Sequence, residues 1–254
     1  MSCTSLKTIT IPASVTYLGY SVFTGCSSLQ TIRVNQDNPF FCAVDGILYS
    51  KDQKNLLVCP GGKTSVTIPN SVVKICQGAF YDCEKLTSIT IPYGVTEIDT
   101  NAFCDCTSLL SVSLSNSITT IGQFAFSNTS ITSITIPNSV SLIDGAAFAD
   151  CKLLKSITLP NSVSSISYST FSGCISLESI VIPASVTSIG SNAFYNCSSL
   201  QNIFFYGSSE QWEQITDNYS CLPNDATKYF YSNENPSSEG NFWHYVDNVP
   251  TIWE

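Results

Sequence analysis

The sequence has few charged residues and few of the residues that usually carry out catalysis. Asp, Glu, Lys and Arg make up 11% of the 254 residues, and there is one His and one Met. Charged residues normally make up about a quarter of a globular domain. No apolar run approaches the roughly 18 residues that a membrane-spanning helix needs, so we predict no membrane insertion.

The motifs of common catalytic sites are also missing. The chain has no Gly-rich phosphate loop, no nucleophile elbow and no H-E-x-x-H pair. The one histidine, His244, lies between aromatic residues in FWHYV, a context typical of a packed strand residue. The sequence therefore predicts a protein that is not an enzyme and that holds no cofactor and no metal.

Positive charge is scarce as well. The net charge is −9, of which −2 falls in residues 1–206 and −7 in residues 207–254. No basic stripe is visible, so nucleic acid is not an expected partner. Met1 is not followed by a basic segment and an apolar run, so no signal peptide is visible. Because the chain begins inside a repeat, we expect it to be part of a longer protein.

What the sequence does contain is one repeat of 22 or 23 residues. Each unit begins with the pattern L-x-x-I-x-I, and a phenylalanine follows 17 residues after most of these starts. The starts are Leu6, Leu29, Lys63, Leu86, Leu109, Ile131, Leu154, Leu177 and Leu200. The aromatic markers are Phe23, Phe80, Phe103, Phe126, Phe148, Phe171 and Phe194.

Each unit has a simple physical interpretation. L-x-x-I-x-I predicts a short strand, which ends where proline removes the N–H that a ladder needs. The following x-x-V-x-x-I-x-x-x-A-F predicts a short helical or 3₁₀ turn with one buried face. One unit cannot enclose its own apolar side, so neighbours must stack. We therefore expect an α/β solenoid of about nine coils, with a parallel sheet on its concave face.

Two segments depart from the repeat. The coil that starts at Leu29 is longer by 11 residues, and ILYS and LLVC around KDQKN predict a β-hairpin inserted at 35–62. This insertion is more typical of structural decoration than of a binding arm. Residues 207–254 follow the solenoid domain at 1–206. There SSEQWEQI predicts a short helix, and KYFYS and FWHYV predict two strands.

The tail is expected to be an α+β cap, because an open solenoid end would expose apolar side chains and strand edges. An alternative is a sugar-binding platform made by the tail aromatics Trp243, Tyr245 and Trp253.

Twelve cysteines raise the question of metals and disulfides. Seven precede a repeat start by three residues: Cys3, Cys26, Cys83, Cys106, Cys151, Cys174 and Cys197. Stacking would align them in one internal column, where a thiol is a small apolar filler and a weak hydrogen-bond donor. A zinc site would need four converging ligands, which a straight column does not offer. Cys42 and Cys59, across the insertion, are the one pair that could form a disulfide.

The third and fifth positions of L-x-x-I-x-I point out of the sheet, because side chains alternate along a strand. Fourteen of the eighteen residues at these positions are Ser or Thr. The eighteen residues are Thr8, Thr10, Thr31, Arg33, Ser65, Thr67, Ser88, Thr90, Ser111, Ser113, Ser133, Thr135, Ser156, Thr158, Ser179, Val181, Asn202 and Phe204. All except Ser65 are candidate ligand contacts.

Two interpretations of this face remain open. Threonine favours strands, and stacked hydroxyls can bond along a column, which needs no ligand. A functional interpretation is an uncharged, hydrogen-bonding surface for an extended protein or a glycan, anchored at the apolar C-terminal end around Val181 and Phe204.

The repeat also carries a family resemblance. The unit SVTSIGSNAFYNCSSLQNI, preceded by ESIVIP, resembles the BspA-like leucine-rich repeats of bacterial and protist surface proteins, over about residues 3–206. The insertion VDGILYSKD and the tail are similar to segments of that family. Ser115 departs from the usual proline, and the unit near Asn128 lacks one residue and its cysteine.

The resemblance implies a non-catalytic role at the cell surface or in secretion. We expect adhesion through a protein ligand, for example a host extracellular-matrix protein, with no catalytic residues. A structural spacer within a larger surface protein and a glycan-binding protein are the alternatives.

Overall fold

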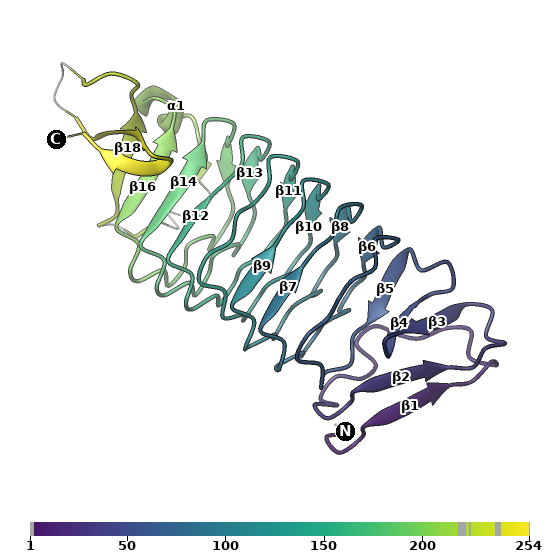
Figure 1. Ribbon diagram of the computed structural model, residues 1–254. Helices are drawn as coiled ribbons and strands as arrows, with labels where there is room; N and C mark the ends of the chain where they lie inside the picture. Colours follow the sequence, from purple (N-terminus) through teal and green to yellow (C-terminus); the bar gives the residue numbers. More distant parts are fainter. Residues whose placement is uncertain (1–2, 218–221, 224, 237–239, 254) are drawn as a thin grey trace.

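The computed structural model describes residues 3–217, 222–223, 225–236 and 240–253. The chain winds into coils that stack side by side along one long axis, with the first coil at one end and the tail at the other (Figure 1). Most of the coils that the structure describes contribute a strand to each of two walls; the coils that begin at Lys63 and Ile131 have a back strand only, and the coil that begins at Leu6 has a front strand only. The molecule is therefore a solenoid, as expected.

The first wall, called the front sheet here, contains the strands that begin seven of the nine coils. They are β1 Thr8–Ile11, β2 Thr31–Val34, β7 Ser88–Thr90, β9 Ser111–Ser113, β12 Ser156–Thr158, β14 Ser179–Pro183 and β16 Asn202–Tyr206. They pair in parallel in three groups, β1 with β2, β7 with β9, and β12 with β14 and β16, and within a group each residue lies beside its equivalent one repeat later, as Thr8 does beside Thr31. The inner residues Ile32, Ile89 and Ile157 are buried, so the predicted alternation is confirmed.

The second wall, the back sheet, is also built of strands. They are β6 Lys74–Ile75, β8 Glu97–Ile98, β10 Thr120–Ile121, β11 Leu142–Ile143, β13 Ser165–Ile166, β15 Ser188–Ile189 and β17 Thr216–Asp217. The coils between residues 3 and 206 contain no helix. The expected helical turn, and with it the α/β class, is therefore wrong: the fold is a β-solenoid.

Backbone conformation explains why no helix forms. Two residues four positions apart in a coil adopt positive φ, for example Asn101 at 56° and Asp105 at 61°. An α-helix cannot continue through such residues, because L-residues in the left-handed region do not extend a right-handed helix. Between them, the N–H of Phe103 donates to the carbonyl of Ala125 in the next coil instead of to its own coil. The A-F segment thus forms another ladder between coils.

The insertion is larger than predicted. The expected hairpin of β4 Ile47–Ser50 and β5 Asn55–Val58 is present, and β3 Phe41–Val44 pairs antiparallel with β4 in addition. Strand β5 then pairs in parallel with β6. The insertion therefore occupies the back-sheet position of its own coil and extends that sheet.

Six of the seven marker phenylalanines form a ladder inside the solenoid. Phe80, Phe103, Phe126, Phe148, Phe171 and Phe194 are fully or almost fully buried. Successive rings are nearly parallel, with centroids 4.6 to 5.8 Å apart. Cys59 takes the place of the phenylalanine in the long coil. Its N–H donates to the carbonyl of Ala79 in the next coil, just as the N–H of Phe80 donates to the carbonyl of Ala102. This ladder is the centre of the core.

The tail contains the predicted elements and continues both walls. Helix α1 Ser209–Glu213 begins with a capping box between Ser208 and Gln211. Strand β17 pairs with β15. Strand β18 Thr227–Tyr231 pairs with β16, β19 Phe242–Val246 follows it, and β20 Val249–Ile252 returns antiparallel. In the described part of the chain, no helix is long and apolar enough to cross a membrane.

Candidate binding face

The outward side chains at the start of the nine coils form one surface, called the front face here. Thirteen of its eighteen predicted residues are exposed, and Thr31, Ser179 and Asn202 are half-buried. The exposed ones are Thr8, Thr10, Arg33, Ser65, Thr67, Ser88, Thr90, Ser111, Ser113, Ser133, Thr135, Ser156 and Thr158. Twelve of these thirteen carry hydroxyls, so the surface offers both donors and acceptors with one formal charge.

Val181 and Phe204 do not form the exposed apolar anchor that the sequence suggested. Each is 5% exposed, and both lie in a small apolar cluster with Trp243, against Tyr229 and Tyr231. The Phe204 and Trp243 rings are 5.4 Å apart. The tail strands continue the front sheet, so their aromatic side chains cover the last two coils. The expectation of an exposed apolar anchor at Val181 and Phe204 is therefore wrong.

The tail aromatics have different roles from one another. Trp243 is fully buried, and its indole N–H donates to the carbonyl of Phe205 at 2.9 Å, so it cannot be part of a sugar platform. Trp253 stacks on His244 at 3.7 Å. Tyr206 and Tyr245 stay 37% and 36% exposed. We call the cluster of Tyr206, Tyr231, Trp243 and Tyr245 the aromatic overhang.

A groove of about 500 Å³ runs along the front face to this overhang. Its floor includes the hydroxyl residues Ser133, Thr135, Ser156 and Thr158. Asn138 and Asn161 line one rim, and Tyr206 and Tyr245 form the far wall. None of the side chains that line it carries a formal charge.

The overhang is held rigidly. Tyr206 stacks on Tyr231 with ring centroids 4.0 Å apart, and Trp243 meets Tyr231 and Tyr245 edge-on at 5.1 and 5.0 Å. A hydrogen bond with the Tyr231 hydroxyl raises the pKa of Tyr206, and burial raises the pKa of Tyr245. Both phenols therefore stay protonated at neutral pH and can donate hydrogen bonds.

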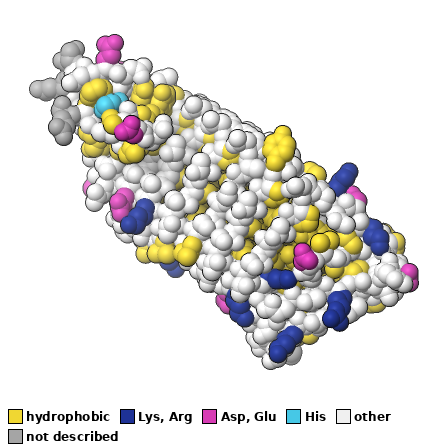
Figure 2. Space-filling view, viewed as in Figure 1, with side chains coloured by type: hydrophobic (Ala, Val, Ile, Leu, Met, Phe, Trp, Pro, Cys, Tyr) yellow, Lys and Arg dark blue, Asp and Glu magenta, His cyan; other side chains and the backbone are white. Residues whose placement is uncertain are grey.

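The opposite end of the front face is different. Arg33 lies beside a second hollow of about 450 Å³ between β2 and the insertion, where the Lys51 ammonium donates to the carbonyl of Asn38 at 2.7 Å. Seven of the ten Lys and Arg residues fall within residues 1–85. Figure 2 shows most of the Lys and Arg side chains of this view gathered toward that end. Most of the Lys and Arg residues thus lie at the opposite end of the solenoid from the aromatic groove.

The column of thiols is internal, as predicted. Cys106, Cys151, Cys174 and Cys197 donate through Sγ to the carbonyl of the ladder phenylalanine one coil earlier, at 3.0 to 3.2 Å. Where the cysteine is missing, Thr129 takes its place and donates to Phe126 at 2.8 Å.

Burial keeps these thiols protonated, and it raises the pKa of Cys151 and of Cys197 to about 12. Cys42 and Cys59 are free thiols in the structure, so this pair forms no disulfide in it. Cys3 is exposed, unlike the other six predicted members of the column. Among the described residues, no group of three or more His, Cys, Asp and Glu is arranged to hold a metal.

Comparison with known proteins places this geometry in a family. The model of the BspA type leucine-rich repeat region matches with six copies, over residues 1–40, 62–154 and 119–221. The chain belongs to the BspA-type leucine-rich repeat family. A search of curated proteins found no match.

Solved structures with similar folds come from bacterial leucine-rich repeat proteins. A leucine-rich cell surface protein of Faecalibacterium prausnitzii is 35% identical, with a TM-score of 0.60, and the match covers 83% of this chain and 51% of that one. The pneumococcal vaccine antigen PcpA is 25% identical, with a TM-score of 0.60, covering 90% and 51%. A leucine-rich repeat protein of Eubacterium ventriosum shares the fold at 24% identity and a TM-score of 0.57, covering 78% and 48%. The chain thus spans about half the length of these proteins.

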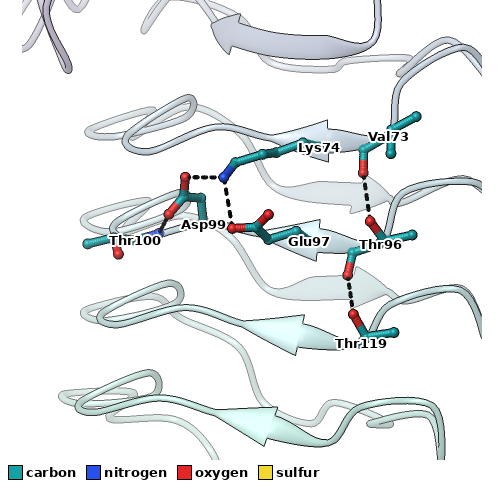
Figure 3. A network of polar contacts seen from close by, with 7 residues as sticks. All are labelled: Val73, Lys74, Thr96, Glu97, Asp99, Thr100 and Thr119. Carbon is teal, nitrogen blue, oxygen red and sulfur yellow. Dashed lines mark hydrogen bonds and ion pairs between the residues drawn. The ribbon is translucent and has the colours of Figure 1, made fainter.

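The back sheet of this BspA-type solenoid carries structural contacts between coils. The Lys74 ammonium lies 2.8 Å from a carboxylate oxygen of Glu97 and 2.8 Å from one of Asp99 (Figure 3). Burial would lower the pKa of Lys74, but the hydrogen bonds and charges of the two carboxylates outweigh it and raise that pKa. Beside them the Thr119 hydroxyl donates to the carbonyl of Thr96. These groups bond one another, which leaves the front face as the candidate surface.

Proposed function

We propose that this BspA-type solenoid is a non-catalytic binding protein of a cell surface, which recognises a protein ligand through its front face. One observation carries the proposal, namely an exposed surface of small hydroxyl side chains. Both outward positions of coil one and of coils three to seven are exposed Ser or Thr. In coil two, Thr31 is half-buried and Arg33 is the one formally charged side chain of the surface. Ser and Thr lose little side-chain entropy on binding and can either donate or accept. The similar protein of Faecalibacterium prausnitzii is described as a cell surface protein, which supports the location.

The competing function is a structural spacer. It is favoured by the phenylalanine ladder, whose close stacking would make a stiff rod. The two functions differ in what the front face does. A spacer tolerates substitutions on that face, whereas a binding protein loses affinity.

The test is a surface plasmon resonance screen against purified extracellular-matrix proteins. The front-face variant is Thr90→Lys with Thr135→Lys, both at exposed positions. The matched control is Ser141→Lys with Ser164→Lys, exposed residues that precede the back strands β11 and β13. Both variants add the same charge, so a difference between them reports position.

We expect saturable binding by the unaltered protein and a loss of tenfold or more only in the front-face variant, because lysines at the centre of an interface are poorly accommodated. Equal binding by both variants would contradict the proposed surface. Absence of binding by the folded, unaltered protein would favour the spacer.

A further inference from the structure

We infer that the groove beneath the aromatic overhang is a binding site for a neutral, linear oligosaccharide. This activity goes beyond the proposed protein recognition, because it uses one end of the front face together with Tyr206, Tyr245 and the two asparagines of the rim. The inference rests on the composition, the spacing and the rigidity of the groove.

Composition is the first argument. The floor and rim present hydroxyls and two carboxamides, Asn138 and Asn161, while the wall presents the rings of Tyr206 and Tyr245. Hydroxyls and carboxamides can donate to and accept from sugar hydroxyls at once. An aromatic face fits the apolar C–H face of a sugar ring, as it fits other apolar groups of that size. Since no lining side chain is charged, the fitting ligand is neutral.

Spacing is the second argument. Within the groove Ser133 and Ser156, Thr135 and Thr158, and Asn138 and Asn161 are equivalent positions of two successive coils, and the groove continues past Val181 and Pro183 to Tyr206. Parallel strands place such positions about 4.8 Å apart. That distance is close to the length of one hexose unit in an extended glycan. The repeat therefore presents the same hydroxyl and amide groups at nearly the period of the ligand.

The lack of charge argues against an extended peptide as the occupant. None of the side chains that line the groove carries a formal charge, so the groove offers no ion pair to the charged side chains or termini of a peptide. Strand β12 pairs with β14 on one side and is the edge strand of its sheet. A peptide could add to such an edge, so peptide binding is one of the outcomes that the experiment below distinguishes.

Rigidity is the third argument. Trp243 is fully buried behind the wall, it donates to the carbonyl of Phe205, and its ring contacts those of Tyr206 and Tyr245. It is a positioning residue, because it holds the two exposed rings without itself reaching the groove. A wall fixed in this way loses little entropy when a ligand binds.

The experiment is isothermal titration calorimetry with neutral gluco-, xylo- and manno-oligosaccharides from dimer to hexamer. Affinity should rise up to about the tetramer, since the groove crosses four coils, and then level off. Raising the salt concentration should leave the affinity unchanged, because screening does not affect a neutral ligand.

The variants separate the groove from the rest of the molecule. Tyr206→Ala and Asn161→Leu should each weaken binding by about tenfold, and Tyr206→Phe should retain most of it because the ring remains. Tyr93→Ala removes a ring that is 78% exposed outside the groove, and Thr90→Lys alters the front face beyond it. Both should bind oligosaccharide normally.

Several outcomes would overturn the inference. They are no binding of any oligosaccharide by the folded protein, binding only of charged glycans or of peptides, and an equal loss in Tyr93→Ala. Asn161 is an exposed residue on the groove rim, so its variant keeps the test informative if Tyr206→Ala disturbs the overhang. Failure of this test would leave the protein-binding proposal intact, since that proposal is tested with matrix proteins as the ligand and Thr90 lies outside the groove.

Discussion

The first coil and an interior coil have almost the same pattern of apolar residues but differ in what that pattern buries. In the coil that begins at Leu109, every core position except the partly buried Leu114 is between 0% and 8% exposed, as Val112 and Phe126 are. The equivalent residues Leu6, Ile9 and Phe23 are only partly buried. Within the described residues, coil one packs against one neighbour and the interior coil against two. Burial in a solenoid is therefore a property of the stack and not of the unit.

The largest expected effect comes from truncating equivalent ring positions in these two coils. Phe126→Ala should lower the free energy of unfolding by about 3–5 kcal/mol, because it opens a cavity in a closed ladder. Phe23→Ala should cost less than half as much, since its ring is already partly exposed. Urea unfolding followed by circular dichroism measures both. Equal losses would show that the first coil is packed as tightly as the interior.

An intermediate and local effect is expected at the other end. Trp243→Ala should uncover Phe204 and Val181 and lower the local free energy of opening of β18 and β19 by about 3 kcal/mol. Hydrogen–deuterium exchange should show lost protection there and unchanged protection around Phe126. Loss of protection along the whole chain would mean that the tail stabilises every coil.

The smallest expected effect concerns the thiols. The pKa of Cys151 is raised to about 12 in the folded state from an ordinary 9.0. The free energy that the protonated, buried thiol contributes to folding is therefore fully present below pH 9 and is lost as the pH rises. Between pH 9 and 10 each such thiol should cost about 1 kcal/mol. Urea unfolding across this range tests it, with Cys151→Thr as the control, since Thr129 already fills one such position. If the free energy of unfolding of Cys151→Thr falls as steeply between pH 9 and 10 as that of the unaltered protein, ionisation of the Cys151 thiol is not the cause.

Thiol labelling adds a direct comparison between the two kinds of coil. At pH 8 iodoacetamide should modify the exposed Cys3 first, whereas Cys106, Cys151 and Cys174 should react only on unfolding, because the thiolate is the reactive form. Mass spectrometry of the labelled peptides reads this out.

Much of the core could be read from the sequence. The period identified the coils, the ladder phenylalanines and the internal thiols, because each depends only on which residues recur at one spacing. The outward direction of Thr90, Thr135 and Thr158 followed from strand alternation in the same way.

The second wall could not be predicted with the same means. V-x-x-I-x-x-x-A-F has apolar spacings that suit a helical turn as well as a strand with tight turns, and periodicity alone does not separate them. The hydrogen bonds between coils decided the matter, because the N–H of Phe103 finds its acceptor in Ala125 of the next coil. Asn and Asp at the positive-φ positions were the available signal, since they tolerate this conformation better than most residues.

By itself the sequence determined the repeat, the number of coils, the buried ladder and the low charge of the front face, because each of these depends only on which residues recur at equivalent positions of the repeat. The tertiary structure decided the contacts at the last coils, where tail residues that have no equivalent in the repeat pack against the solenoid. Only the packed tail shows that Trp243 covers Val181 and Phe204 and that Tyr206 and Tyr245 form the wall of a groove. These contacts join residues of different coils and of the tail, and no local pattern specifies which side chains meet.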